Sequence, residues 1–273
     1  MISLIIPSYR NPEYLDLCLK SAVDGRASVP GATEIICVLD GFVEESEHLI
    51  EKYQDTVAFL KFEQNYGMQT ALNYGVYNAS HENILIINDD NVLCNGWDTL
   101  SHWVTDKEVI TINQIEPTGP GIFNFPVKDF GRTPEEFKFK EFDDYAAELN
   151  TPDEDQDKWF TPDGGIFPFM MKKKDYMASG GFDTIYQSPF ICDWDFFLKL
   201  ELAGCSFRRT NLLHYYHFGS AATKNRTDGD KIKFKASEQP AAELYNYKWG
   251  HAPRIYENNS HAPKGQTIRG ITY

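Results

Sequence analysis

The sequence contains no apolar run that approaches the roughly 18 residues needed to cross a membrane. It also lacks a basic surplus, since 26 Lys and Arg stand against 40 Asp and Glu and give a formal net charge of −14. A nucleic-acid-binding protein needs a basic face for phosphates, so the composition argues against that class and against docking on anionic lipid. An anionic small-molecule substrate would need a metal ion and local cations.

Cysteine is scarce, and its pattern does not suggest pairing. The five cysteines are odd in number, include no C-x-x-C pair, and mostly lie in apolar runs, as do Cys18, Cys37 and Cys205. We interpret them as small core residues in a reducing compartment. Residues 1–7 lack the basic start and the cleavage site of a signal peptide, so we interpret them as a first strand and expect a cytoplasmic location.

Strand-like and helix-like patterns alternate through the first half of the 273 residues. The apolar content of 42% is enough for a sizeable core. The alternation predicts βαβ units and an α/β fold, with a mostly parallel central sheet flanked by helices. Predicted strands are 2–7, 34–39, 57–62, 84–87 and 166–171, and predicted helices start after Asn11 and cover 44–53, 65–79 and 195–203.

The second half of the chain has a different character. Residues 133–158 are dense in Glu and Asp, which predicts an exposed, partly helical insertion in a domain of residues 1–220. A solvated surface without chemistry is the simpler interpretation of this segment. Residues 221–273 are polar and mixed in charge, and we expect a C-terminal extension that is packed on the domain or partly mobile.

Two adjacent acids follow a buried strand. Residues 84–87 are Ile-Leu-Ile-Ile, and Asn88-Asp89-Asp90-Asn91 come directly after them. In sheets of this kind ligands bind beyond the carboxyl ends of the strands, and carboxylate oxygens suit Mg²⁺ or Mn²⁺, which in turn suit a diphosphate. The G-x-G-x-x-G fingerprint and the G-x-x-x-x-G-K-[ST] loop are both absent, so a nucleotide site here would be of another kind. A plain acidic turn is the alternative.

Three further residues could carry chemistry. Asp193 lies among apolar neighbours where a helix is predicted to begin, so it could be a general base toward a hydroxyl group or an ordinary helix cap. Asp195 fits the first turn of that helix better than it fits catalysis. His214 and His217 would face opposite ways on a strand, so at most one joins a given site, and a lone histidine of this kind is more often structural.

The motifs together resemble a family 2 glycosyltransferase with the GT-A fold. The similarity runs in order from residue 2 to about residue 220. Each motif is weak alone, and the ordered set is specific. The matching segments are 3–10, Val38-Leu39-Asp40-Gly41, the N-x-G repeats at 65–67 and 73–75, Asn88-Asp89-Asp90 at the D-x-D position, Gly180-Gly181-Phe182-Asp183, Asp193-Trp194-Asp195, His217-Phe218-Gly219-Ser220 and a tail motif at Tyr247-Lys248-Trp249-Gly250.

The resemblance implies a transfer of a sugar, with inversion, from a nucleoside diphosphate sugar to an acceptor hydroxyl of a glycan or glycoconjugate. A UDP-sugar is the favoured donor, and Mn²⁺ or Mg²⁺ is the implied cofactor. Tyr9 would stack on the base and Asp40 would bond it. The other implied roles are nucleotide binding for Pro7, Arg10, Asn65, Gly67 and Asp89 (the last at the ribose), metal binding for Asp90 and His217, and catalysis by Asp193 as the base.

An acceptor or donor-sugar surface would be lined by Trp159, Asp163, Gly164, Gly165 and Trp194, because aromatic faces suit sugar rings and glycines allow close backbone approach. Core packing is at least as good an interpretation of Trp194.

Three positions depart from the family pattern, which has acids where this chain has Leu39, Asn88 and Cys192. Two other functions therefore stay open. One is a nucleotidyltransferase that makes the activated sugar, although its glycine-rich basic loop is missing after the first strand. The other is a non-catalytic nucleotide- or glycan-binding domain.

Overall fold

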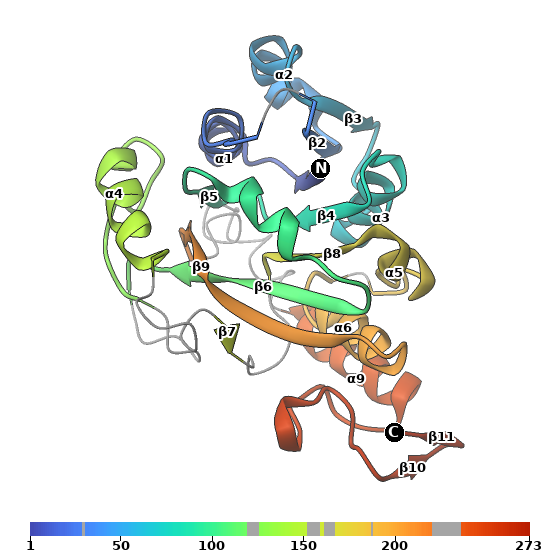
Figure 1. Cartoon of the computed structure of the whole chain (residues 1–273). Helices are drawn as coiled ribbons and strands as arrows, with labels where there is room; N and C mark the ends of the chain where they lie inside the picture. The colour runs from blue at the N-terminus through green and yellow to red at the C-terminus, as the bar shows by residue number, and fades with distance from the viewer. Residues whose placement is uncertain (29–30, 119–125, 152–158, 161–166, 187, 220–235) are drawn as a thin grey trace.

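One large sheet forms the centre of the protein in the computed structural model, which describes residues 1–28, 31–118, 126–151, 159–160, 167–186, 188–219 and 236–273 (Figure 1). Within these residues the sheet has nine strands. In spatial order they are β3 (Ala58–Phe62), β2 (Thr33–Asp40), β1 (Ile2–Ser8), β4 (Asn83–Ile86), β8 (Phe169–Lys172), β6 (Glu108–Ile115), β9 (Ser206–His217) and β5 (Asn91–Leu93), and β7 (Trp159–Phe160) pairs with β9.

The first half of this sheet is parallel, as the alternating pattern predicts. Strand β1 pairs in parallel with both β2 and β4, and β2 pairs in parallel with β3. Strand β8 then lies antiparallel between β4 and β6, while β6 and β9 are parallel to each other. A separate antiparallel pair, β10 (Thr267–Ile268) and β11 (Ile271–Thr272), lies near the C-terminus. The predicted α/β class is confirmed.

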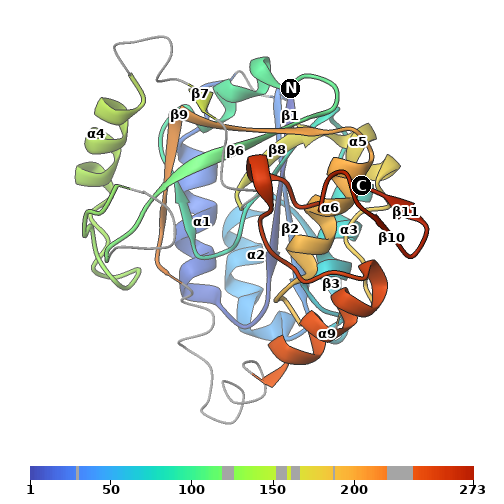
Figure 2. The same ribbon diagram turned by 90° about the horizontal axis from the view of Figure 1, so that it is seen from below.

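Helices cover both faces of the sheet (Figure 2). One apolar core contains residues of α1 (Pro12–Asp24), α2 (Glu47–Tyr53) and α4 (Phe139–Leu149). The other contains residues of α3 (Met68–Asn78), α5 (Lys173–Ala178), α6 (Cys192–Leu202) and α9 (Glu238–Trp249). Shorter 3₁₀ helices are η1 (Val43–Ser46), η2 (Trp97–Trp103) and η4 (Glu257–Asn259).

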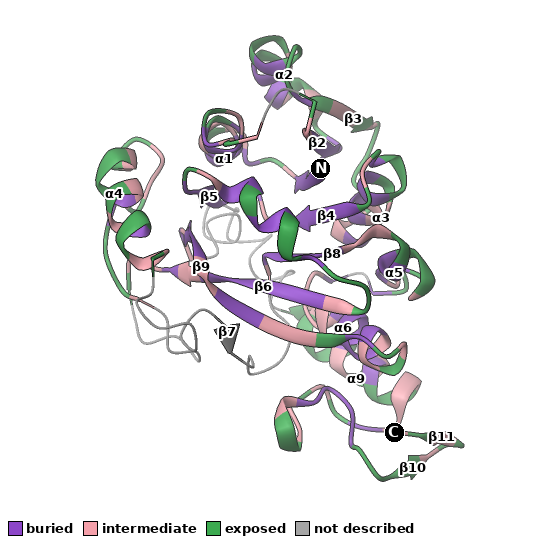
Figure 3. Ribbon diagram, viewed as in Figure 1, coloured by how far each residue is buried: buried purple, intermediate pink, exposed green. Residues whose placement is uncertain are grey.

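The sheet is buried on both faces, which explains its continuous apolar runs (Figure 3). Every residue of β1 is buried. Leu4 and Ile6 point into the core under α1, whereas Ile5 points into the core under α3, as the alternation of side chains along a strand requires. None of the helices in the described ranges is long and apolar enough to span a bilayer.

Two helix starts differ from their predicted form. Asn11 precedes α1, but its side chain makes no capping hydrogen bond, and Pro12 occupies the first helical position. Helix α6 begins at Cys192, earlier than the predicted start at Asp195, so Asp193 lies within its first turn. The early start follows a left-handed residue, Ile191, which the sequence pattern did not reveal.

The acidic segment predicted as an exposed insertion is not wholly exposed. Helix α4 lies within it, and both Phe142 and Ala146 of this helix are fully buried. Phe137 packs on Tyr216 of β9, with ring centroids 5.1 Å apart. An apolar stripe at helical spacing therefore docks the segment on the sheet, while its acids face outward. Residues 152–158 lie outside the described part of the chain.

The connection between β4 and β5 makes the sheet curl. In a flat sheet these strands would lie four spacings apart, about 19 Å. The chain from Ile86 to Asn91 spans at most about 17 Å when fully extended, and it contains a turn in which the Asn91 amide bonds to the Asn88 carbonyl at 3.3 Å. The two ends of the strand order must therefore approach each other, and Asp89 and Asp90 lie at this junction.

Helix α3 lies so close to the sheet that only glycine fits at position 75. A Cβ there would lie 2.6 Å from Cγ2 of Ile5 and 3.1 Å from Cγ2 of Val38.

We predict that Gly75→Leu lowers the free energy of unfolding by about 1–3 kcal/mol, because the buried strand residues have to move. Urea denaturation measures the change. Tyr77→Ala on the exposed side of α3 is the control and should change stability by less than about 0.5 kcal/mol.

Candidate active site

The two acids after β4 point to different neighbours. The Ser8 hydroxyl at the end of β1 donates a hydrogen bond of 2.6 Å to Oδ2 of Asp89. Asp89 is buried, and this burial, together with the nearby charge of Asp90, raises the pKa of Asp89 to about 7. The side chain of Asn91 closes the turn by accepting a bond of 3.1 Å from the Asn88 amide. Asp89 is thus fixed against β1.

Asp90 instead faces β9. Its Oδ2 lies 3.7 Å from Nε2 of His217, and the Phe218 amide approaches the Asp90 carbonyl at 3.4 Å. Nδ1 of the same imidazole lies 3.0 Å from Oε1 of Glu116, which follows β6. A carboxylate on one ring nitrogen fixes the tautomer that presents the other nitrogen as an acceptor or ligand. Glu116 was not identified from the sequence, because no motif marks an acid that acts through another side chain.

A bulge in β9 determines which histidine faces this cluster. The pairing with β6 jumps from Thr210 opposite Ile112 to His214 opposite Asn113, which inserts extra residues into β9. His214 then points away, with Nδ1 2.8 Å from Oδ1 of Asn150. Burial lowers the pKa of His214 to about 4, so this histidine is a neutral structural link to the end of α4.

Asp40, at the end of β2, holds the loop before α3. Its two carboxylate oxygens accept the backbone amides of Tyr66 and Gly67 at 2.7 and 2.9 Å. Burial raises the pKa of Asp40 while these two bonds oppose the shift. Gly41, with φ +84°, lets the loop approach, since a Cβ there would lie 2.8 Å from the backbone of Asn65. Asn65 itself is exposed at the surface of the loop.

Aromatic and charged side chains gather beyond β1 and β2. The rings of Tyr9 and Phe42 meet edge to face, with centroids 5.7 Å apart. The Arg10 guanidinium lies 4.4 Å from the Phe42 centroid and pairs with Glu45 at 3.1 Å. Arg10 and Phe42 both have positive φ angles, 52° and 53°, which side chains of this size rarely adopt. Phe42 is 40% exposed and was not among the predicted site residues.

The remaining predicted residues are distributed as follows. Pro7 is a buried strand residue that pairs with Val38. Trp194 is partly buried and packs edge-on against the buried His261, with ring centroids 5.4 Å apart. Trp159 lies in β7, but its side chain is not described. Asp163, Gly164 and Gly165 lie outside the described residues.

Asp193 occupies the first turn of α6. Burial raises its pKa to about 6, although its carboxylate accepts the Trp194 amide at 2.9 Å. Ile191, just before the helix, has φ +70°, a strained conformation for a β-branched residue. On the other side, Nε2 of Gln69 in α3 donates to the Ser188 carbonyl at 2.6 Å. The segment before α6 is therefore tied to the first turn of α3.

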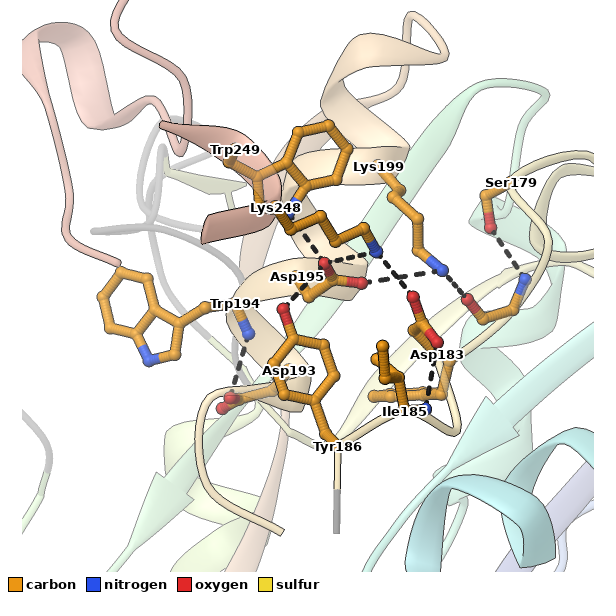
Figure 4. A network of polar contacts seen from close by, with 12 residues as sticks. Ser179, Asp183, Ile185, Tyr186, Asp193, Trp194, Asp195, Lys199, Lys248 and Trp249 are labelled. Carbon is orange, nitrogen blue, oxygen red and sulfur yellow. Dashed lines mark hydrogen bonds and ion pairs between the residues drawn. The ribbon is translucent and has the colours of Figure 1, made fainter. Parts of the chain in front are cut away.

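Asp195 has a different environment from Asp193 (Figure 4). It is fully buried, and its Oδ1 accepts hydrogen bonds from Nε1 of Trp249 at 2.7 Å and from the Tyr186 hydroxyl at 3.1 Å. Nζ of Lys248 lies 2.7 Å from the same oxygen. Asp195 therefore joins α6 to α9.

The chemistry of the donor set fits a small divalent cation. In the described ranges, no group of three or more His, Cys, Asp or Glu side chains could hold a metal ion. Asp90 and His217 nevertheless place an oxygen and a nitrogen close enough to share one ion. Mg²⁺ and similar cations are commonly held by one or two protein groups, with phosphates and water completing the shell. The residues present therefore suit a cation that binds together with a diphosphate.

Sequence comparison gives a family match and two partial relatives. Residues 3–126 match the model described as Glycosyl transferase family 2. Uncharacterized glycosyltransferases of Rickettsia typhi (strain ATCC VR-144 / Wilmington) and Rickettsia prowazekii (strain Madrid E) are 30% and 32% identical over 92 residues. Each alignment covers 34% of this chain, and the chain spans only 28% of the length of the curated relatives that it matches.

Solved structures share the fold. The crystal structure of GalNAc-T7 with UDP, GalNAc and Mn²⁺ has a TM-score of 0.58 at 13% identity, over 80% of this chain and 43% of that one. The crystal structure of S. aureus TarS has a TM-score of 0.56 at 15% identity, over 92% and 44%. Identities this low establish the architecture alone, which is the GT-A fold.

Proposed function

We propose, from the premise that this chain carries a family 2 glycosyltransferase domain with the GT-A fold, that it transfers a sugar from a nucleoside diphosphate sugar to an acceptor hydroxyl of a glycan or glycoconjugate, with inversion. The observation that carries the proposal is the junction after β4, where Asp89 contacts β1 and Asp90 faces His217. At one end of this junction, Asp89 adjoins the end of β1, where we expect the nucleotide to bind. At the other end, Asp90 and His217 offer ligands for a cation.

The donor would lie across the ends of β1 and β2. Tyr9 and Phe42 offer aromatic faces to a base, and Asp89 offers a carboxylate to ribose hydroxyls. Asp40 would bond the base directly, or it would act indirectly by holding the loop before α3 through two backbone amides. Asn65 and Gly67 belong to that loop and would contact the nucleotide. A UDP-sugar is the favoured donor, and the GalNAc-T7 structure, which shares the fold, contains UDP.

Asp90 and His217 would hold the cation, Mn²⁺ or Mg²⁺, against the diphosphate. When bound, the cation neutralises negative charge on the leaving diphosphate. Within the protein, Glu116 keeps the His217 ring oriented so that Nε2 faces Asp90. The bound cation would supply the positive charge that an anionic donor needs in a chain of net charge −14.

Asp193 would accept the proton of the acceptor hydroxyl as that oxygen attacks the anomeric carbon. A carboxyl group with a pKa of about 6 is mostly ionised at neutral pH, yet it is more basic than an ordinary aspartate. Desolvation supplies this basicity. The segment that leads into α6 is bonded to α3 through Gln69 and the Ser188 carbonyl.

We predict that Asp193→Asn lowers kcat by about 10²–10⁴-fold, because the amide cannot accept the proton. Release of nucleoside diphosphate from UDP-, GDP- and dTDP-sugars is measured with Mn²⁺ and candidate acceptors. The donor should still raise the melting temperature of the variant, since donor binding does not need the base. Asp144→Asn, at an exposed ion pair with Lys140, is the control and should keep wild-type turnover. Unchanged turnover in Asp193→Asn would exclude Asp193 as the base.

A second prediction concerns pH. Because Asp193 must be deprotonated to act, kcat at saturating donor should be level near pH 7–8 and should fall about tenfold per unit below about pH 6. Initial rates from pH 5 to pH 8 give the profile. An acid limb near pH 4, the range of an ordinary aspartate, would show that the desolvation of this carboxyl does not persist in the working enzyme.

A third prediction concerns Glu116. Glu116→Ala should weaken Mn²⁺ binding in the presence of UDP by about 10–100-fold, because His217 loses the partner that orients it. Electron paramagnetic resonance of free Mn²⁺ measures the affinity directly. Glu116→Gln, which keeps an acceptor oxygen, should recover part of the loss. Glu108→Ala, at the other end of β6, where Glu108 pairs with Arg208, is the matched control. Equal affinities for all three variants would exclude this role for Glu116.

A further inference from the structure

The C-terminal helix α9 contacts the helix of the proposed base through a network of charges (Figure 4). Lys248 lies 2.7 Å from Asp195 in α6 and 2.7 Å from Asp183 in the Gly-Gly-Phe-Asp turn. Lys199, one turn after Asp195, lies 3.7 Å from its Oδ2 and also donates to the Gly181 carbonyl. Two lysines and two aspartates thus join the turn, α6 and α9.

Trp249 and Tyr186 complete the environment of the buried carboxylate. Both donate to the same oxygen of Asp195 that Lys248 approaches. A carboxylate with no solvent exposure needs such partners, since its ionised form is otherwise strongly disfavoured. Two of these three partners, Lys248 and Trp249, come from α9. The buried carboxylate in the first turn of α6 therefore depends on α9 for most of its polar contacts.

The Asp193 carboxylate, in contrast, has few hydrogen-bond partners. In the part of the chain that the structure describes, the Asp193 carboxylate receives one hydrogen bond, from the adjacent Trp194 amide, and no side chain donates to it. The position of this carboxylate therefore follows the position of the helix start. That start includes the strained Ile191, whose carbonyl accepts the Asp195 amide at 3.1 Å, and a strained residue keeps its conformation only when its surroundings enforce it.

We infer that Lys248 and Trp249 are positioning residues: through Asp195 they hold the first turn of α6, and so place the Asp193 carboxylate for proton transfer. The inference rests on the proposed function of Asp193. It makes α9 a working part of the proposed catalytic unit, in contrast to an appendage that only adds stability. The nucleotide and cation residues lie on other elements, so the network acts on turnover and not on donor binding.

The first test does not require activity. Hydrogen exchange is followed in the peptide covering residues 190–198, which contains the Asp195 amide. Exchange in this peptide should be at least tenfold faster in Trp249→Phe, which removes the indole donor but keeps a ring, and faster still in Lys248→Met. Lys248→Arg, which keeps a cation able to reach two carboxylates, should stay near wild type.

A matched control breaks another link between the C-terminal segment and α6. Lys264 pairs with Glu201 at 3.0 Å, near the far end of the helix and about 12 Å along its axis from Asp193. Lys264→Met should leave exchange in 190–198 unchanged. Equal exchange in Lys248→Met, Trp249→Phe and wild type would overturn the inference, whether or not sugar transfer is ever observed.

The second test separates positioning from stability. Well below the melting temperature of each variant, kcat should fall about 10–100-fold in Trp249→Phe and Lys248→Met, because a small displacement of a reacting group costs this much, while the KM for the donor stays within about twofold. Lys264→Met and Lys248→Arg should keep wild-type kcat. Ile191→Gly relieves the strained backbone and should restore part of the kcat that Trp249→Phe loses.

The outcomes distinguish this inference from the proposed function. Faster exchange in 190–198 with unchanged kcat would overturn the positioning role, because the turn would loosen without consequence for the base. A parallel loss of kcat and donor affinity would indicate general destabilisation and would also overturn it. If the wild-type protein turns over no sugar nucleotide, the proposed function fails, and the exchange data still decide whether α9 holds the start of α6.

Discussion

The short connection between β4 and β5 is the constraint on which the rest of the structure depends. Its few residues must join two strands that stand at distant positions in the strand order, so the sheet has to curl until they meet. The same turn separates two adjacent carboxylates, with Asp89 against Ser8 and Asp90 against His217. A longer loop would satisfy the chain without curling the sheet, and the two halves of the site would then lose their common edge.

Burial of carboxylates is the second theme, and it has a cost that the fold offsets differently at each site. Asp40 is balanced by two backbone amides, and Asp195 by a lysine, an indole and a phenol. At Asp193 burial raises the pKa to about 6, and the bond from the adjacent Trp194 amide offsets only part of this shift. The carboxylate that we propose as the base thus has the fewest partners, whereas Asp40 and Asp195 each accept at least two hydrogen bonds. The three aspartates are chemically alike, but their different environments suit them to different roles.

The sequence predicted the parts of the structure that depend on local pattern. The apolar runs predicted the strands of the parallel half, and the ordered motifs predicted the fold class that the comparisons confirm. Contacts between distant elements could not be read in the same way. Glu116 contacts His217, which is 101 residues away along the chain. Lys248 contacts Asp195, which is 53 residues away, and neither spacing leaves a local signature. The bulge in β9 leaves no mark in the local sequence pattern, so only the pairing with β6 reveals the shift. The aromatic stripe of α4 was obscured by the acids around it.

The family match ends at residue 126, and this boundary separates the proposed nucleotide residues from the proposed base and its supporting contacts. Residues 3–126 contain the elements around Ser8, Asp40 and Asp89, where we propose that the nucleotide binds. His217, Asp193 and the α9 network all lie beyond that region, on β9 and on helices that are packed together by Asp195. Sugar nucleotides present the same kinds of group, so under the proposed function a shared donor chemistry would constrain the first region. The acceptor side would face no such common demand, and its supporting contacts could differ between proteins that hold a base at the same place. In this chain we infer that α9 provides that support through Asp195.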